Sequence, residues 1–158
     1  MQSRSGSAVT VGDIMVRPAP YVRCADDLVA AAQLMRDLDL RALPICEPDG
    51  RLVGMLRDRD IVTCCVAEDD DPARVCAREF AEGPPTRVHM WLLVHHALHL
   101  MMARRLAYLP VVEHDRLVGL VDLGGVLDAV ASQRARAPRS LADVVDLDEH
   151  RSSFRAHY

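Results

Sequence analysis

The sequence predicts an α/β (α+β) protein built from two tandem copies of one β-α-β-β-α unit. Three observations support this: a strand-turn-strand segment occurs twice, a helical pattern precedes each copy, and a turn sequence divides each pair of strands. The first segment is LPICEPDGRLVGML at 43–56, and its counterpart, LPVVEHDRLVGLV, begins 66 positions later. A repeat of this length indicates two copies of one supersecondary unit that stack to bury their apolar faces.

The segment before each copy has the spacing of a helix with one buried face. Its apolar residues recur at intervals of three and four. They are Leu28, Ala31, Ala32, Met35 and Leu38 in the first copy, and Val94, Ala97, Leu98 and Met101 in the second. Asp26 or Asp27 precedes the first series and is the expected N-cap, since a short carboxylate side chain accepts from the first free backbone N–H groups.

Each copy then predicts a hairpin and a second helix. Glu-Pro-Asp-Gly at 47–50 is a strong turn sequence between two short apolar runs. The expected elements are strands at 43–46 and 51–56, helices at 59–67 and 124–133, and leading strands centred on Val22 and Val88. The apolar faces of these elements are expected to form one continuous core.

The same reading divides the chain into five segments. A charged run with a proline, Glu68–Pro72, ends the first copy. The segments are a flexible N-terminus at 1–9, a first motif at 10–68, an acidic linker at 69–73, a second motif at 74–133, and a tail at 134–158 that could form a short helix.

Composition excludes several classes of function. The formal charge is −4, whereas nucleic-acid binding needs clustered positive charge, so a nucleic-acid partner is not expected. The apolar runs are shorter than the ~20 residues that span a bilayer, and the start lacks a signal peptide, so we expect a cytoplasmic protein without membrane contact. The five cysteines lack CxxC spacing, which is typical of reduced thiols.

The doubled order of strand, helix, hairpin and helix resembles the CBS domain pair, named after cystathionine β-synthase. The resemblance covers about residues 10–132 and lies in ALPICEPDGRLVGMLRDRDIV and YLPVVEHDRLVGLVDLGGVL. It implies two motifs packed about a pseudo-twofold axis, with two clefts that hold AMP, ADP, ATP, NAD or S-adenosylmethionine as regulatory ligands. It also implies regulation of an unidentified partner protein, a homodimer, no required cofactor, and no enzyme activity.

The family pattern after the glycine strand is Gly-h-h-Thr/Ser-x-x-Asp, and here it reads Gly54 to Asp60 with Arg57 at the hydroxyl position. The resemblance implies that Asp60 binds the ribose hydroxyls of the ligand and that the helix start binds its phosphate. Arg57 and Asp58 also lie at this helix start. A guanidinium suits phosphate, although its bulk could fill the cleft. The alternative is that Asp60 only stabilises the helix. The resemblance places the adenine base against Tyr21, Val22, Ala42, Leu43 and Pro44, which could otherwise be plain core.

The second copy departs further from the family pattern. Asp122 stands at the hydroxyl position and Gly125 at the ribose-binding position. A carboxylate repels a phosphate by about 1 kcal/mol at 4 Å even in water. This cleft is therefore not expected to bind phosphate.

Histidine and cysteine residues supply a competing hypothesis. His95 and His99 have the i, i+4 spacing of metal ligands on one helix face. No Glu or Cys stands at a ligand spacing beside them, so no metal site is predicted. Three functions stay open: a sensor of an adenosyl ligand, a partner-binding or structural dimer without nucleotide, and a metal- or redox-responsive protein.

Overall fold

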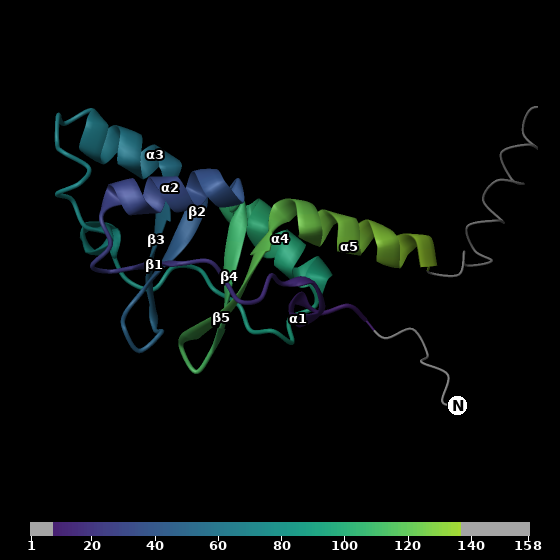
Figure 1. Cartoon of the computed structure of the whole chain (residues 1–158). Coiled ribbons are helices and arrows are strands. Elements are labelled where there is room, and N and C mark those ends of the chain that lie inside the picture. Colours follow the sequence, from purple (N-terminus) through teal and green to yellow (C-terminus); the bar gives the residue numbers. More distant parts are fainter. Residues whose placement is uncertain (1–7, 137–158) are drawn as a thin grey trace, which may run out of the picture.

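The computed structural model describes residues 8–136 and has the predicted α+β architecture (Figure 1). The first repeat holds β1 (Val22–Arg23), α2 (Leu28–Leu38), β2 (Ala42–Cys46), β3 (Leu52–Arg57) and α3 (Asp58–Ile61), which continues as a π-helical segment, η1 (Val62–Val66). The second holds α4 (Val94–Arg104), β4 (Tyr108–Glu113), β5 (Arg116–Asp122) and α5 (Leu123–Arg136). Two short lead-in helices, α1 (Val11–Ile14) and the 3-10 helix η2 (Ala77–Phe80), precede the repeats.

The predicted helix patterns and turns are confirmed at the residue level. The Asp27 carboxylate accepts a 2.8 Å hydrogen bond from the Ala30 backbone N–H and caps α2. The first hairpin turns through Gly50 at φ +86°, and the second through His114 and Asp115 at φ 50° and 63°. Both turns therefore use the left-handed backbone region, which Gly, Asn, Asp and His tolerate best.

The strands form two sheets rather than one. β1, β2 and β3 form a three-stranded sheet, in which β1 runs parallel to β2 and β2 antiparallel to β3. β4 and β5 form an antiparallel pair. The leading strand expected at Val88 is reduced to a single parallel bridge with Val111, because the backbone on either side of Val88 makes no further ladder.

The expectation of one continuous core is wrong. Buried residues fall into two clusters, one per repeat, and a small third cluster of Cys46, Leu52 and Val112 joins the hairpin ends. The sheets also meet there through the backbone, since the Leu52 N–H donates to the Asp115 carbonyl and the Leu117 N–H to the Gly50 carbonyl.

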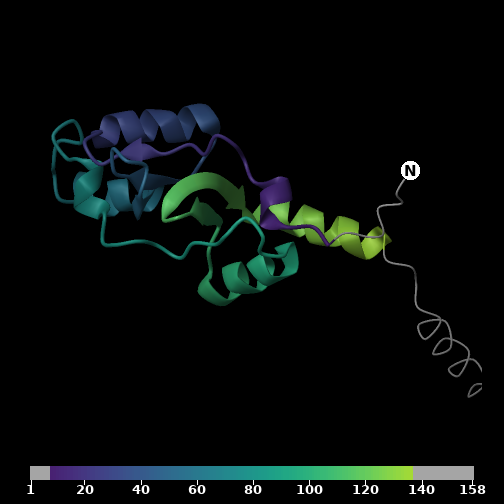
Figure 2. The same cartoon turned by 90° about the horizontal axis from the view of Figure 1, so that it is seen from below.

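The lead-in helices are exchanged between the repeats. α1 precedes the first repeat but packs on α5 and β5 of the second, as Figure 2 shows beside the start of α5. Its Val11 N–H donates to the Leu92 carbonyl at 2.7 Å, and Val11 lies in the second core. Conversely, η2 precedes the second repeat, while Ala77 lies in the first core and donates its N–H to the Asp26 carbonyl at 2.9 Å. Each repeat therefore completes the core of the other.

Two predictions concern segments beyond this description. The expected flexible segment at 1–9 falls mainly, and the possible tail helix within 137–158 entirely, outside the described residues. Among residues 8–136, no helix is long and apolar enough to cross a membrane.

Candidate functional site

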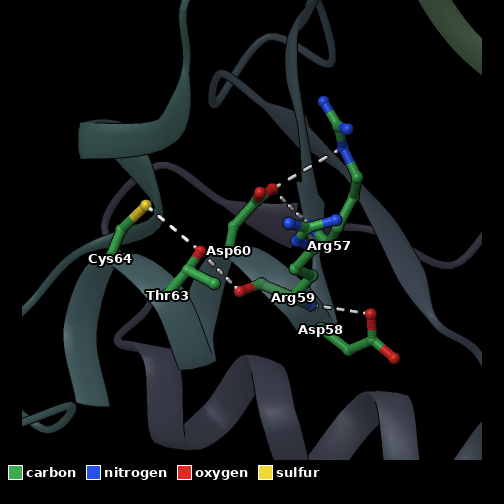
Figure 3. A network of polar contacts seen from close by, with 6 residues as sticks. All are labelled: Arg57, Asp58, Arg59, Asp60, Thr63 and Cys64. Atoms are coloured by element: carbon green, nitrogen blue, oxygen red, sulfur yellow. Dashed lines mark hydrogen bonds and ion pairs between the residues drawn. The ribbon is translucent and has the colours of Figure 1, made fainter. Parts of the chain in front are cut away.

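The motif residues of the first repeat meet where β3 ends and α3 begins (Figure 3). The Asp60 Oδ2 atom accepts a hydrogen bond from the Arg57 backbone N–H at 3.0 Å and lies 3.7 Å from the Arg57 Nε atom. Asp60 thus caps α3 by reaching back to the residue before the helix. The Arg57 side chain is 69% exposed and that of Asp60 25% exposed, so both charges stay accessible to a ligand.

Asp58 is bound to a second arginine. Its Oδ2 atom accepts from the Arg41 Nε at 3.0 Å, and its Oδ1 atom from the Arg59 backbone N–H at 2.7 Å. The carboxylate raises the pKa of the Arg41 guanidinium by hydrogen bonding and by its charge. The Arg41 backbone N–H in turn donates to the Tyr108 hydroxyl of the second repeat at 3.3 Å. Asp58 is therefore positioned at the contact between the repeats.

The apolar residues of the predicted base site divide into two groups. Four of them are buried in β1 and β2: Val22, Ala42, Leu43 and Pro44. Their burial agrees with the core interpretation, and they pack within the protein. Tyr21 differs, because it is 43% exposed and lines a pocket.

That pocket, which we call pocket 1, has a volume of about 700 Å³ and lies between the repeats. One wall is the segment Val16–Tyr21, a second is the C-terminal end of α2, and the third comes from β4 and β5. The lining residues are Val16, Pro18, Ala19, Pro20, Tyr21, Leu34, Leu38, Asp39, Leu40, Tyr108, Leu120 and Asp122. Pocket 1 is thus a largely apolar cleft with two carboxylates and two tyrosines.

Pocket 1 carries Asp122, and Asp60 does not line it. The sequence predicts that Tyr21 and Asp60 bind the same ligand, but the structure does not bring them into one pocket. The reason is the exchange of the lead-in segments, since the chain before β1 crosses to the second repeat. Leu38, Asp39 and Tyr108 were missed, although the position of each at an element end was a usable signal.

Asp122 caps its helix in the reverse manner from Asp60. Its Oδ1 atom accepts a hydrogen bond from the Gly125 backbone N–H at 2.9 Å. Asp122 thus precedes α5 and accepts from a residue inside the helix. In the first repeat, Asp60 lies inside α3 and accepts from the backbone N–H of the residue that precedes the helix. The two acids thus occupy opposite ends of the same capping arrangement, and the helix start is satisfied in both repeats.

A second, smaller pocket of about 420 Å³, pocket 2, is formed by residues of the second half of the chain. Its lining residues are Pro85, Thr86, Arg87, His89, Leu100 and Arg104. An Arg104 guanidinium nitrogen donates to the Thr86 hydroxyl at 3.0 Å. Arg87 forms an ion pair with Asp115 at 2.9 Å. Among the described residues, the lining of pocket 2 thus carries two arginines and no acidic residue, and Asp115 outside it pairs with Arg87.

The histidine and cysteine side chains are dispersed. His95 and His99 lie exposed on α4, and the residues at 8–136 hold no group of three or more His, Cys, Asp or Glu side chains placed to bind one metal ion. All five cysteines are free; Cys64 is exposed, while Cys24, Cys46 and Cys65 are buried. Burial raises the pKa of the Cys46 thiol to about 12.

Comparisons with known proteins agree with this architecture. The family described as CBS domain matches residues 11–67 and 92–132. Hypoxic response protein 1 of Mycobacterium tuberculosis is 40% identical over 112 residues, which are 71% of this chain and 78% of the relative. A crystal structure titled Hypoxic Response Protein I, with two coordinated zinc ions, is 38% identical, has a TM-score of 0.70, and covers 76% of this chain and 98% of its own.

Two further solved structures share the fold at lower identity. CBSX2 in complex with AMP is 21% identical with a TM-score of 0.69, and covers 80% of this chain and 98% of its own. A CBS domain pair in complex with 5′-methylthioadenosine and S-adenosyl-L-methionine is 22% identical with a TM-score of 0.69, and covers 80% and 99%.

Proposed function

The chain belongs to the CBS domain family, and we propose that it is a non-catalytic regulatory module that binds an adenosine-containing ligand in a cleft between its two repeats. The observation that carries this proposal is pocket 1. Its volume of about 700 Å³ lies within the range of about 300–1,000 Å³ that is usual for small-molecule sites. Two structural neighbours hold AMP, or methylthioadenosine and S-adenosylmethionine.

The walls of pocket 1 have the chemistry that a nucleoside needs. The side chains of Leu34, Leu38 and Leu120 offer an apolar surface for a base, and Tyr21 offers an aromatic face. The carboxylates and tyrosine hydroxyls can form hydrogen bonds with the ribose, since a carboxylate can accept from both ribose hydroxyls. Apolar walls with a few convergent polar groups are the usual form of such sites.

Arg57 and Asp60 retain a separate role in the proposal. Neither residue lines pocket 1, so a phosphate-bearing nucleotide would bind at a separate place, with its phosphate at the Arg57 guanidinium and the start of α3 and its ribose at Asp60. Asp60 already accepts one hydrogen bond through Oδ2, so it binds the ribose while still capping the helix. This part rests on the family pattern and on the exposure of both side chains.

The remaining parts of the proposal are a cytoplasmic homodimer and a regulated partner protein. Exposed apolar side chains lie on the helices, and a dimer would cover them: Val62, Val66, Met102 and Leu127 are 58%, 60%, 66% and 46% exposed. Association that covers such side chains removes apolar surface from water, which favours a dimer. Sedimentation of the full chain, with and without Val66→Glu, measures this directly.

A thermal-shift screen with AMP, ADP, ATP, NAD and S-adenosylmethionine tests the ligand. A ligand at 100 times its Kd stabilises the native state by about 2.7 kcal/mol. Tyr21→Ala should remove about 1–3 kcal/mol of base stacking and most of the shift. Trp91→Ala, at an aromatic residue that is 66% exposed and lines none of the pockets described above, should leave the shift intact.

The alternative functions predict other results in the same protein. A partner-binding dimer that binds no nucleotide shows the same Tm with and without each ligand of the panel. A metal-responsive protein carries stoichiometric metal when purified without a His tag. Either result, without a nucleotide shift, would contradict the proposal.

A further inference from the structure

Several residues that line pocket 1 have an equivalent position in the other repeat, and some of these equivalents line pocket 2. Asp39 and Arg105 end α2 and α4 at matching positions, both in the left-handed region with φ 54° and 55°. Asp122 pairs with Tyr108 at the end of β5, as Arg57 pairs with Ala42 at the end of β3. These pairings fix which residue of one repeat corresponds to which residue of the other.

The equivalent positions carry opposite charges. Asp39 and Asp122 line pocket 1; their equivalents in the other repeat are Arg105 and Arg57, neither of which lines pocket 2. Leu38 and Tyr21 also line pocket 1, and their equivalents Arg104 and Arg87 line pocket 2. Among the described residues that line pocket 1, two are acidic and none is Lys or Arg. The internal repeat therefore has one acidic, apolar cleft and one cleft whose lining carries two arginines.

This asymmetry decides what pocket 1 accepts, because a phosphate would enter a cleft with two negative charges and no cation in its lining. Each unit charge of like sign 4 Å away weakens binding by roughly fivefold even in water. A positively charged group at the same place strengthens binding by the same factor. An uncharged nucleoside meets only the apolar walls and hydrogen-bonding groups.

We infer that pocket 1 selects a nucleoside whose 5′ substituent is uncharged or positively charged and rejects 5′-phosphorylated nucleotides, with Asp39 and Asp122 as the residues that set this preference. The inference rests on the proposed function, since it assumes that an adenosine-containing ligand enters the cleft. It adds the charge of the ligand and the two residues that read it.

Both residues allow a substitution that removes charge and leaves the fold intact. Asn caps a helix as well as Asp does, so Asp122→Asn keeps the bond to the Gly125 N–H. Asn also tolerates the left-handed region that Asp39 occupies, so Asp39→Asn adds no strain. Asp37→Asn is the matched control, because Asp37 lies on the same helix, pairs with Arg36 at 2.8 Å, and does not line pocket 1.

The test uses three ligands that differ at the 5′ position alone: 5′-amino-5′-deoxyadenosine, adenosine and AMP. Adenosine is titrated directly into the full chain by calorimetry, and the amine and AMP are titrated in competition with it, so that only the shared pocket is counted. We expect the amine to bind tightest and AMP weakest, with a factor of roughly five between neighbours in the series for each carboxylate that acts at about 4 Å. The Asp39→Asn, Asp122→Asn double variant should bring the three affinities together, and Asp37→Asn should preserve the order.

The outcomes separate the two proposals. If adenosine binds but AMP displaces it with equal or higher affinity, the charge selection is overturned and the proposed function stands. An order that survives in the double variant likewise removes Asp39 and Asp122 from the explanation. If none of the three ligands binds, the proposed function itself fails, and the selection fails with it.

Discussion

Two glycines at equivalent positions hold the exchanged lead-in segments against the sheets, and replacing each by alanine should have different effects. A Cβ atom added at Gly54 would lie 2.8 Å from the Ala81 Cα and 3.2 Å from the Phe80 carbonyl oxygen. Carbon atoms pack at about 3.5–4.0 Å, and both obstacles are backbone. The segment after η2 would have to move, and we expect Gly54→Ala to lower the free energy of unfolding by about 2–3 kcal/mol.

Gly119 meets a more flexible obstacle. A Cβ atom there would overlap the Met15 Sδ atom and lie 3.1 Å from the Met15 Cβ. Methionine has three rotatable bonds and adapts to irregular spaces, so Gly119→Ala should cost only about 1 kcal/mol. However, Met15 precedes the Val16–Tyr21 wall of pocket 1. Gly119→Ala should therefore weaken ligand binding in pocket 1 more than Gly54→Ala does.

Urea denaturation measures the first effect, and calorimetry with adenosine the second. Gly125→Ala is the control, because its Cβ atom would lie 3.5 Å from an Asp122 oxygen, an ordinary contact, and alanine favours a helix interior by about 0.5–1 kcal/mol. A Gly54→Ala protein within about 0.5 kcal/mol of the parent, well below the cost of ordinary overpacking, or one less destabilised than Gly119→Ala, would refute the packing argument.

The other predictions concern thiols, pH, the repeats and Asp60. At pH 8 a maleimide should modify exposed Cys64 and leave buried Cys46 intact in native protein; rapid native labelling of Cys46 would contradict its burial. Since burial raises the folded pKa of Cys46 to about 12 from its ordinary value near 9.0, its contribution to stability should be complete below pH 9 and lost between about 9 and 12. Cys46→Ala should reduce this pH dependence in alkaline melting curves. Fragments 1–70 and 71–158 should each fail to melt cooperatively alone, because each lacks the lead-in helix that completes its core, and should regain a transition when mixed. Asp60→Ala should cost about 1 kcal/mol of stability through the lost cap and weaken AMP binding at the separate Arg57–Asp60 site about ten- to hundredfold; unchanged AMP affinity by calorimetry would remove Asp60 from the proposal.

Local features were predictable because their causes are local. The helix α2 follows from apolar spacing and from Asp27 as its N-cap, and the hairpins follow from their turn sequences. The motif identifies Asp60, and its bond from the Arg57 N–H agrees with the alternative that Asp60 stabilises the helix. Each of these depends on residues within one turn or one hairpin of each other.

The arrangement of the site depends on contacts distant in sequence, and these were not predictable. No pattern near Tyr21 states that its segment crosses to the second repeat, where Val16 bridges Leu120. That crossing places Tyr21 with Asp122 rather than with Asp60. The leading strand predicted at Val22 is confirmed as the two-residue β1, whereas Val88 forms only one isolated bridge, because its pairing also depends on a contact distant in sequence.

The exchange of lead-in helices also bears on how the chain folds. The hydrogen bond from Val11 to Leu92 closes a loop that contains the whole first repeat and the linker. Loop closure must be paid in entropy before such a contact forms, and topologies rich in distant contacts fold more slowly. The hairpins and α2, α4 and α5 can form from nearby residues, whereas α1 gains its partners only after the second repeat has been synthesised. Docking of α1 is therefore expected among the last events of folding, and until then the apolar side chains of Val11 and Met15 stay available to other chains.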